Sequence, residues 1–303
     1  MAREHRLTSP LMTATVLDGF ALAAVVRAEV QQGLQAFQRA HRTVPGLDVV
    51  LVGEDPASQV YTRNKEKASN EVGMRGRLHR LPAATTEANL LELLAELNAD
   101  DAVDGILVQL PLPKQIDDKK VLDAVSPHKD VDGFHPINVG LLASGRPGLV
   151  PCTPSGCMRL LALSKVDLAG ARAVVVGRSN IVGKPVAQLL LAEHATVTIA
   201  HSRTADLPGV CREADILVVA AGRPKLIGAG HVRPGAVVID VGTTPTETTD
   251  GTDRGGLAGD VDAAAVTGIA SVLTPVPGGV GPVTIAVLMQ HTLAAAARAA
   301  GPD

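Results

Sequence analysis

Aromatic side chains are almost absent from this 303-residue chain, which has no Trp and contains only Phe20, Phe37, Tyr61 and Phe134. A surface that stacks nucleic-acid bases needs several aromatic rings beside a basic stripe, and a net charge of −3 with mixed signs provides no such stripe. We therefore expect no nucleic-acid partner. The cores must be built from Val, Leu, Ile and Ala.

Cysteines are also few, and their spacing matches no metal or redox motif. Cys152, Cys157 and Cys211 are odd in number and form no C-x-x-C pair. We find no secretory leader pattern and no apolar run near the roughly 18 residues needed to span a bilayer. These features predict a reduced, cytoplasmic protein without a membrane partner.

A glycine-bearing turn between residues 173 and 185 is the most informative stretch of the chain. Small and β-branched residues, Ala173–Val176, run into Gly177 and then into a helical pattern, which is typical of a buried parallel strand that feeds a helix. Free N–H groups and the positive dipole end at such a helix start attract phosphate. An α/β turn without any ligand is the alternative, because fold alone does not define function.

Two standard phosphate-binding signatures do not match this turn. Five residues separate Gly177 from Gly183, and proline occupies position 185, so the turn is not a P-loop. Ser179 and Val182 occupy two glycine positions of the dinucleotide fingerprint. Strand-like segments nevertheless follow at 196–200, 216–220 and 237–241, with helical spacers between them. This alternation predicts a Rossmann-like, doubly wound parallel sheet.

The chain is long enough for two α/β domains. We expect residues 1–150 to form an N-terminal domain and residues 151–282 to form the Rossmann-like domain. A final helix, 283–300, is expected to pack back on the first domain. Residues 1–16 should be a polar lead, and residues 242–256 an exposed loop.

The N-terminal half shows the same alternation of strands and helices. Asp18 is expected to cap a long helix that Pro45 and Gly46 stop. A strand at 47–52 leads through a turn into a helix that carries Tyr61 and Lys65. A strand around Leu78, a helix at 87–97 and a strand at 104–109 follow, and a further helix is expected at 154–163.

Tyr61 and Lys65 lie four residues apart on the predicted helix and therefore point the same way. A lysine beside a phenol and away from bulk water can act as an acid or a base. An ordinary solvated helix face is the alternative. The Tyr-x-x-x-Lys of short-chain dehydrogenases lies downstream of their glycine-rich turn, whereas this pair precedes Gly177 by more than a hundred residues, so chain order excludes that class.

Polar residues near the ends of the next elements are further candidates. Gln109 ends a predicted strand, where open α/β sheets bind ligands, although a plain polar strand end is the alternative. Asp132 is suited to accept hydrogen bonds from an amino-bearing heterocycle. His128, Asp130, Asp132 and His135 match no standard metal spacing, so we expect no metal.

The residues after the strand at 196–200 bear on the choice of nucleotide. An NAD site prefers an acidic residue here, whereas Ser202 and Arg203 suit the 2′-phosphate of NADP. Arg178 adds a second charge, with a plain surface cation as its alternative. The prolines and glycines of Pro275–Pro282 make a rigid loop that a flat ligand can approach closely.

Taken together, these motifs closely resemble the bifunctional methylenetetrahydrofolate dehydrogenase/cyclohydrolase family. The resemblance spans nearly the whole chain and rests on five stretches in the family's order: Pro56–Tyr61 with Lys65, Asp104–Pro113, Lys129–Phe134, Gly177–Pro185 and Pro275–Pro282.

The resemblance implies a two-domain enzyme with a folate cleft between the domains, joined as a homodimer through the nucleotide-binding domain. NADP would accept a hydride from 5,10-methylenetetrahydrofolate, and the methenyl product would be hydrolysed to 10-formyltetrahydrofolate. Such an enzyme serves one-carbon metabolism, which feeds purine, methionine and histidine synthesis.

The resemblance also implies residue roles. Lys65 would be the principal catalytic residue of the hydrolysis, Gln109 would position it, Tyr61 would lie against the folate ring and Asp132 would hold the pterin. The same pocket would be bordered by Pro277, Gly278 and Gly279. The expected NADP contacts are Gly177, Arg178, Ser179, Ser202 and Thr243.

Two positions depart from the family pattern. Phe20 stands where the family commonly has a lysine, and Thr243-Thr244-Pro245 replaces the usual Ile-Asn. The second departure leaves the nicotinamide-side contact open. Two other functions remain as alternatives: a dehydrogenase that has lost the hydrolase step, against which the retained Tyr61, Lys65 and Gln109 argue, and a non-catalytic NADP-binding protein.

Overall fold

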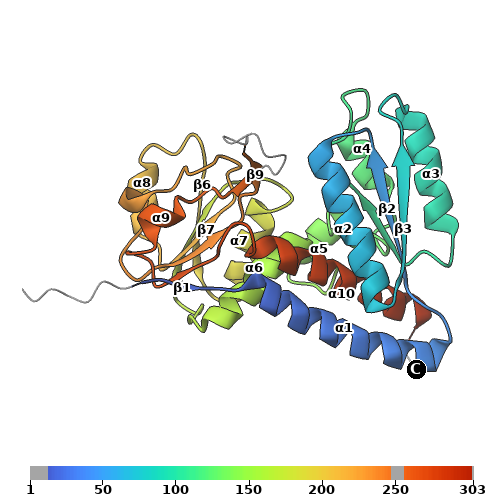
Figure 1. Cartoon of the computed structure of the whole chain (residues 1–303), viewed down its shortest axis with the longest axis horizontal. Helices are drawn as coiled ribbons and strands as arrows, with labels where there is room; N and C mark the ends of the chain where they lie inside the picture. Colours follow the sequence, from blue (N-terminus) through green and yellow to red (C-terminus); the bar gives the residue numbers. More distant parts are fainter. Residues whose placement is uncertain (1–12, 247–255, 302–303) are drawn as a thin grey trace, which may run out of the picture.

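Two α/β lobes lie side by side above a pair of long helices in the computed structural model, which describes residues 13–246 and 256–301 (Figure 1). The smaller lobe holds a three-stranded sheet and the larger lobe a six-stranded one. The long helices α1 (Gly19–His41) and α10 (Val280–Ala300) start at the inner edge of the C-terminal lobe and run beneath the N-terminal lobe.

The N-terminal lobe is a parallel sheet in the order β3-β2-β4. The central strand β2 is buried along its whole length, which explains its nearly continuous apolar sequence. The strands are β2 (Gly46–Val52), β3 (Arg75–Leu81) and β4 (Gly105–Val108). The helices are α2 (Pro56–Val72), α3 (Glu87–Ala99), α4 (Asp118–Ala124) and α5 (Pro136–Ala143).

The C-terminal lobe is a parallel six-stranded sheet in the order β1-β11-β8-β7-β5-β6. The predicted Rossmann-like sheet is therefore confirmed. Its strands are β1 (Thr15–Val16), β5 (Arg172–Val176), β6 (Thr196–Ala200), β7 (Ile216–Val219), β8 (Val237–Asp240) and β11 (Val272–Leu273). Its helices are α7 (Gly183–Ala192), α8 (Leu207–Arg212), the 3₁₀ turn η1 (Ala229–His231) and α9 (Ala263–Val266).

The N-terminal segment is not simply a polar lead. Residues 1–12 lie outside the described residues, but β1 pairs in parallel with β11, so the beginning of the chain extends the C-terminal sheet. A two-residue strand carries too little periodicity to be recognised from the sequence, and only its pairing partner defines it.

Three helices join the lobes. Helix α1 starts as predicted, because Asp18 Oδ1 accepts the Ala21 N–H at 3.0 Å. It ends at His41, where Arg42 adopts a left-handed conformation, before Pro45 is reached. Helix α10 packs against α1, α2 and α6 (Cys152–Ser164). One apolar core consequently runs without a break from β2 through these helices to β5.

Helix α10 is the one helix in the described ranges that is long and apolar enough to cross a membrane. Half of its apolar window is buried inside the protein. This burial against the other joining helices accounts for its composition without any lipid.

The described part of the expected loop at 242–256 contains a short strand. β9 (Thr244–Pro245) pairs in antiparallel fashion with β10 (Leu257–Ala258), while residues 247–255 lie outside the described residues. The division of the chain at residues 150 and 282 remains a prediction.

Candidate active site

Helix α2 presents Tyr61 and Lys65 to the space between the lobes. The helix starts at a defined position because Asp55 Oδ2 accepts the Ser58 N–H at 2.8 Å and Pro56 occupies its first turn. Both Tyr61 and Lys65 are half-buried and line the same cleft. The four-residue spacing thus places the two side chains on the face of α2 that lines the cleft.

Lys65 is held in place by Gln109, which emerges where β4 ends. Gln109 Nε2 donates to the Leu110 carbonyl oxygen at 2.7 Å, which turns Oε1 toward Lys65. Lys65 Nζ donates to that Oε1 at 3.0 Å. An ammonium has three donors, so this bond orients the group and leaves donors for a ligand.

Asp132 comes from a third segment, the loop between α4 and α5, and interacts electrostatically with Lys65. Burial raises the pKa of the Asp132 carboxyl to about 6, Lys65 acts to lower it and Asp130 acts to raise it. The nearby Cys152 thiol also acts to lower the pKa of Asp132. The structure therefore brings Lys65, Gln109 and Asp132 together from three separate parts of the chain.

The loop that carries Asp132 is fixed by two residues that the sequence analysis did not assign. Cys152 Sγ and His291 Nδ1 both contact the Val131 carbonyl oxygen, at 3.2 and 3.1 Å. A carbonyl can only accept, so Nδ1 carries the proton. Burial lowers the pKa of His291 to about 4, and the ring is neutral at pH 7. No local pattern marks His291, because it acts from α10 across the fold.

The neighbouring polar residues do not converge on a metal site. Asp130 accepts the backbone N–H groups of Phe134 and His135 and the amide of Asn138, so it shapes its own loop. His135 Nδ1 accepts the N–H of Ile137 at the start of α5. Within residues 13–246 and 256–301, no group of three potential ligands is close enough to hold a metal ion.

The loop Pro275–Pro282 forms one wall of the cleft, which has a volume of about 580 Å³. Pro277, Gly278 and Gly279 all line it, as do Tyr61, Lys65 and Gln109. Gly278 has a φ of 102°, and its carbonyl accepts the Gly19 N–H at 2.9 Å. This hydrogen bond fixes the start of α1 against the loop Pro275–Pro282.

A second pocket of about 330 Å³ lies at the carboxyl ends of β5, β6 and β7. Gly177, with a φ of 130°, sits where any Cβ would collide with the Ala220 carbonyl oxygen. Ser179 Oγ accepts the N–H groups of Val182 and Gly183 at 3.1 and 3.2 Å. The N–H groups that we expected to be free at this helix start are thus already bonded by the turn's own hydroxyl.

Cations and hydroxyls line the second pocket. Gly177, Arg178, Ser179 and Ser202, which are expected NADP contacts, all border it. Arg203 does not border it, whereas Arg223 does. Our sequence analysis missed Arg223, although it follows the carboxyl end of β7, where ligands of open α/β sheets are expected.

Thr243 lines the first cleft rather than the second pocket. The loop that carries it is anchored by Asp240, whose carboxylate accepts the N–H groups of Gly242, Asp260 and Val261. Asp260 in turn accepts the N–H groups of Ala221 and Gly222 at 2.6 and 2.8 Å. Two buried carboxylates therefore hold the loops that face both pockets.

The turn at 177–182 joins the two pockets, since Gly177–Ser179 border the nucleotide side and Val182 borders the cleft that contains Lys65. A Rossmann-like sheet whose pocket opens beside a lysine-bearing cleft defines a class of two-lobed, dinucleotide-dependent α/β enzymes. The chemistry then depends on the residues of the cleft.

Comparison with known families identifies the particular member of this class. Residues 17–132 match the catalytic domain of tetrahydrofolate dehydrogenase/cyclohydrolase, and residues 151–300 match its NAD(P)-binding domain. The chain therefore belongs to the tetrahydrofolate dehydrogenase/cyclohydrolase family.

Individual relatives agree with this assignment over nearly the full length. The bifunctional protein FolD of Sorangium cellulosum is 64% identical and is aligned over 94% of this chain and 98% of its own. The crystal structure of the Campylobacter jejuni bifunctional enzyme superposes with a TM-score of 0.88 at 45% identity, covering 93% of this chain and 98% of that one. The Trypanosoma brucei enzyme, solved with NADP and an inhibitor, gives a TM-score of 0.92 at 41% identity, over 96% and 99% of the two chains.

Proposed function

We propose that this protein is a bifunctional one-carbon folate enzyme. It oxidises 5,10-methylenetetrahydrofolate with NADP and hydrolyses the 5,10-methenyl product to 10-formyltetrahydrofolate. The observation that carries the proposal is the turn at 177–182, which borders the nucleotide pocket on one side and the Lys65 cleft on the other.

The second pocket fits a dinucleotide phosphate. Gly177 leaves room where a side chain would fill the cradle, and Arg178, Arg223 and Ser202 supply charge and a hydroxyl for phosphate groups. NADP, when bound, supplies a hydride acceptor. Thr243, on the loop that Asp240 anchors, lines the first cleft and would border the nicotinamide end. The protein's part in this step is orientation of the two reactants.

The hydrolysis needs proton transfer rather than a metal. Water adds to the bridging carbon of the methenyl cation, the bond from that carbon to N5 breaks, N5 gains a proton and one proton is released. Lys65 lies in the cleft with its Nζ oriented by Gln109, so it is the group that manages these protons. Tyr61 lines the cleft and provides a flat wall for the folate. Asp132, which interacts electrostatically with Lys65, would accept hydrogen bonds from the pterin.

An absorbance time course with methylenetetrahydrofolate and NADP, repeated with NAD, tests the dehydrogenase. A separate assay of methenyltetrahydrofolate loss tests the hydrolase. NADP-dependent turnover with accelerated methenyl loss is expected. Dehydrogenation alone would leave the monofunctional alternative, and absence of both activities would leave a non-catalytic NADP-binding protein.

We also propose a homodimer joined through the C-terminal lobe. The sheet ends at β6, where Ile199 is 42% exposed, and Leu191 on the adjacent α7 is 63% exposed. Exposed sheet edges with apolar side chains favour pairing. Light scattering on the purified chain, with an Ile199→Lys variant as comparison, tests this arrangement. A cytoplasmic location and a role in purine, methionine and histidine synthesis remain predictions.

A further inference from the structure

A buried carboxylate, Asp260, lies beside the nucleotide pocket and has no part in the proposed chemistry. Its side chain is fully buried. Its Oδ2 accepts the N–H groups of Ala221 and Gly222 at 2.6 and 2.8 Å. These two residues lie just after β7 and directly precede Arg223, which borders the pocket. Asp260 therefore holds the backbone from which the Arg223 side chain starts.

The segment that carries Arg223 is bonded to Asp260 on both sides. Before Arg223, the carboxylate binds the two N–H groups. After Arg223, the main-chain carbonyl of Asp260 accepts the Ile227 N–H at 3.0 Å. Only the first of these attachments uses the side chain. Replacing Asp260 should therefore release the backbone before Arg223 while the main-chain bond after it persists.

Asp260 is itself fixed by a second buried carboxylate, Asp240. The Asp260 N–H donates to Asp240 Oδ1 at 2.9 Å. The other oxygen of Asp260, Oδ1, is buried and has no hydrogen-bond partner within the described part of the chain. It lies against Gly242, where any Cβ would collide with it. A buried oxygen without a partner costs stability, so stability alone does not account for a carboxylate at this position.

The surroundings of Arg223 indicate which part of NADP it meets. Arg178 and Ser202 border the same pocket. Ser202 follows β6, where a Rossmann-like sheet holds the adenosine ribose. NADP differs from NAD only by a phosphate on the 2′ position of that ribose. Arg223 is exposed, and a long, flexible side chain can present its guanidinium to this phosphate only when its backbone is correctly placed.

We propose that Asp260 is a positioning residue for the choice of cofactor: by holding Ala221 and Gly222, it sets Arg223 against the 2′-phosphate of NADP. This inference rests on the proposed function of the second pocket. NAD lacks that phosphate, so loss of the positioning should weaken the binding of NADP and leave that of NAD unchanged. A guanidinium–phosphate contact of this kind should contribute about tenfold to the affinity.

The test compares kcat/KM of the full-length protein with NADP and with NAD. The ratio of the two values does not depend on the fraction of folded protein. Arg223→Gln should lower this NADP/NAD ratio about 10-fold, and Asp260→Ala about 3- to 10-fold. Because Asp260 acts through Arg223, the double variant should lose no more than Arg223→Gln alone. A double variant that loses the product of the two single effects would overturn the proposal, as would a wild-type ratio in either single variant.

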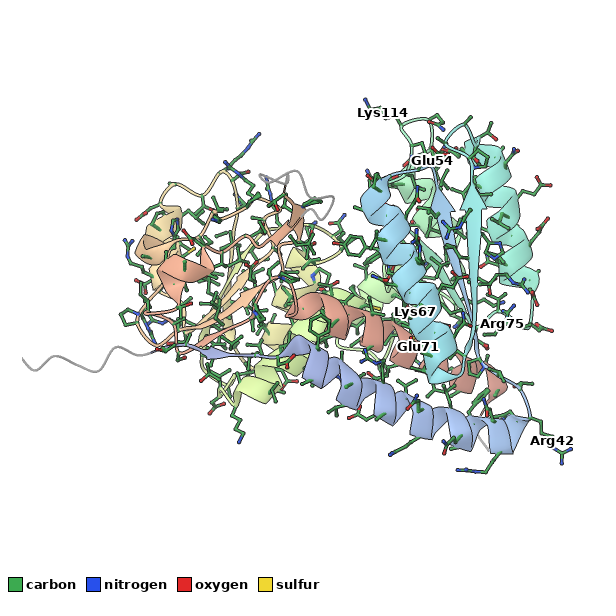
Figure 2. The ribbon with its side chains drawn as sticks, in the orientation of Figure 1. Arg42, Glu54, Lys67, Glu71, Arg75 and Lys114 are labelled. Carbon is green, nitrogen blue, oxygen red and sulfur yellow. The ribbon has the colours of Figure 1, made fainter. Side chains whose placement is uncertain are left out.

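Two variants control for charge and for local disturbance. Lys114→Gln removes one positive charge, as Arg223→Gln does, but Lys114 lies at the far end of the N-terminal lobe and lines neither pocket (Figure 2). Asp262→Ala removes a neighbouring carboxylate that makes no capping hydrogen bond. Both should keep the wild-type ratio, and a loss in either would contradict the proposed positioning.

A conservative variant tests the two hydrogen bonds themselves. Asp260→Asn keeps an acceptor oxygen for the N–H groups of Ala221 and Gly222, so it should restore most of the ratio. A ratio as low as that of Asp260→Ala would contradict the role of these bonds. If Asp260→Ala does not fold, Asp260→Ser takes its place, because its hydroxyl is too short to reach both N–H groups. An unchanged ratio in Asp260→Ser would overturn the positioning role.

Calorimetric titration with NADP and with NAD separates this inference from the proposed function. Lack of turnover would count against the enzyme assignment. Tighter binding of NADP than of NAD, reduced in Asp260→Ala and reduced no further in the double variant than in Arg223→Gln, would still support the positioning role. Equal binding of the two nucleotides by the wild type would overturn it.

Discussion

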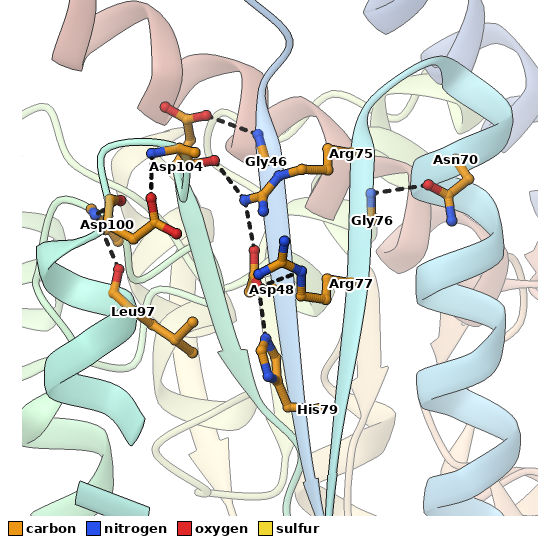
Figure 3. A network of polar contacts seen from close by, with 12 residues as sticks. Gly46, Asp48, Asn70, Arg75, Gly76, Arg77, His79, Leu97, Asp100 and Asp104 are labelled. Atoms are coloured by element: carbon orange, nitrogen blue, oxygen red, sulfur yellow. Dashed lines mark hydrogen bonds and ion pairs between the residues drawn. The ribbon is translucent and has the colours of Figure 1, made fainter. Parts of the chain in front are cut away.

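Asp48 and Asp132 are two acidic residues of the same lobe, and they differ in what surrounds them. Asp48 is fully buried on β2, where Arg75 Nη2 and His79 Nε2 donate to its carboxylate at 2.9 and 2.7 Å and Arg77 lies 3.9 Å away (Figure 3). Asp132 lies near Lys65, which lines the cleft; Lys65 acts to lower the pKa of the Asp132 carboxyl and Asp130 acts to raise it.

The difference separates a structural charge cluster from a functional one. The arginine and histidine side chains around Asp48 come from the neighbouring strand β3, and Arg75 and His79 donate to its two oxygens. The cluster therefore joins two strands and has little capacity left for a ligand. Asp132 is buried without such compensation, which raises its pKa to about 6. When cations balance the charge of a buried carboxyl only in part, a substrate that binds nearby can change its protonation state.

Replacing Lys65 should have the largest effect. Lys65→Met removes the proton-handling group and the donor to Gln109, so methenyltetrahydrofolate hydrolysis should fall by roughly 10³-fold. NADP binding, measured by titration, should survive because the second pocket is separate. Lys114→Met serves as the control, and normal hydrolysis in Lys65→Met would refute the assigned role.

Replacing Asp48 should act on stability instead of chemistry. Asp48→Asn leaves Arg75 and His79 without their carboxylate and should lower the free energy of unfolding by about 3 kcal/mol, measured in urea. Activity per folded molecule should not change. Asp123→Asn, an exposed acid on α4, is the control. A loss of activity without loss of stability would place Asp48 in the functional cluster.

Replacing Asp132 should change the pH dependence. The ionised carboxylate is the better acceptor for a pterin, so kcat/KM should rise with pH through about 6 in the wild type. Asp132→Asn should abolish that rise and lower kcat/KM by roughly 10- to 100-fold, or about 1.4 to 2.7 kcal/mol. If kcat/KM still rises with pH in Asp132→Asn, another titrating group causes the rise.

The same pKa predicts a stability effect of opposite sign. Between the ordinary value of 3.8 and about 6, the folded state keeps a proton that the unfolded state has lost. Asp132 therefore makes the wild type less stable as pH rises through this window, and Asp132→Asn should remove that slope. Unfolding curves at several pH values measure it.

The smallest effect is expected at His291, which positions the Asp132 loop. His291→Leu removes the donor to Val131 and should cost about 1 kcal/mol of stability. It should also shift the Asp132-dependent rise in kcat/KM, whereas His291→Asn, which keeps an N–H donor, should restore it. If kcat/KM rises at the same pH in His291→Leu as in the wild type, the role of His291 is purely structural.

Much of the local structure was predictable because it depends on short-range patterns. Asp18 capped α1 as expected, and the alternation of strands and helices gave both sheets. The strand β1 and the contacts of His291 were not predictable, since each depends on a partner more than a hundred residues away. Arg223 was predictable, because it follows the carboxyl end of a strand, but our sequence analysis overlooked it.

By itself, the sequence determined the fold class, the family and the residue types that carry the chemistry, because spacing within a helix or at a strand end depends only on backbone geometry. Tertiary structure alone decided that Lys65, Gln109 and Asp132 meet and that Arg75 and His79 donate to the buried Asp48. Burial and charge compensation arise from long-range packing, and they set what each group can do.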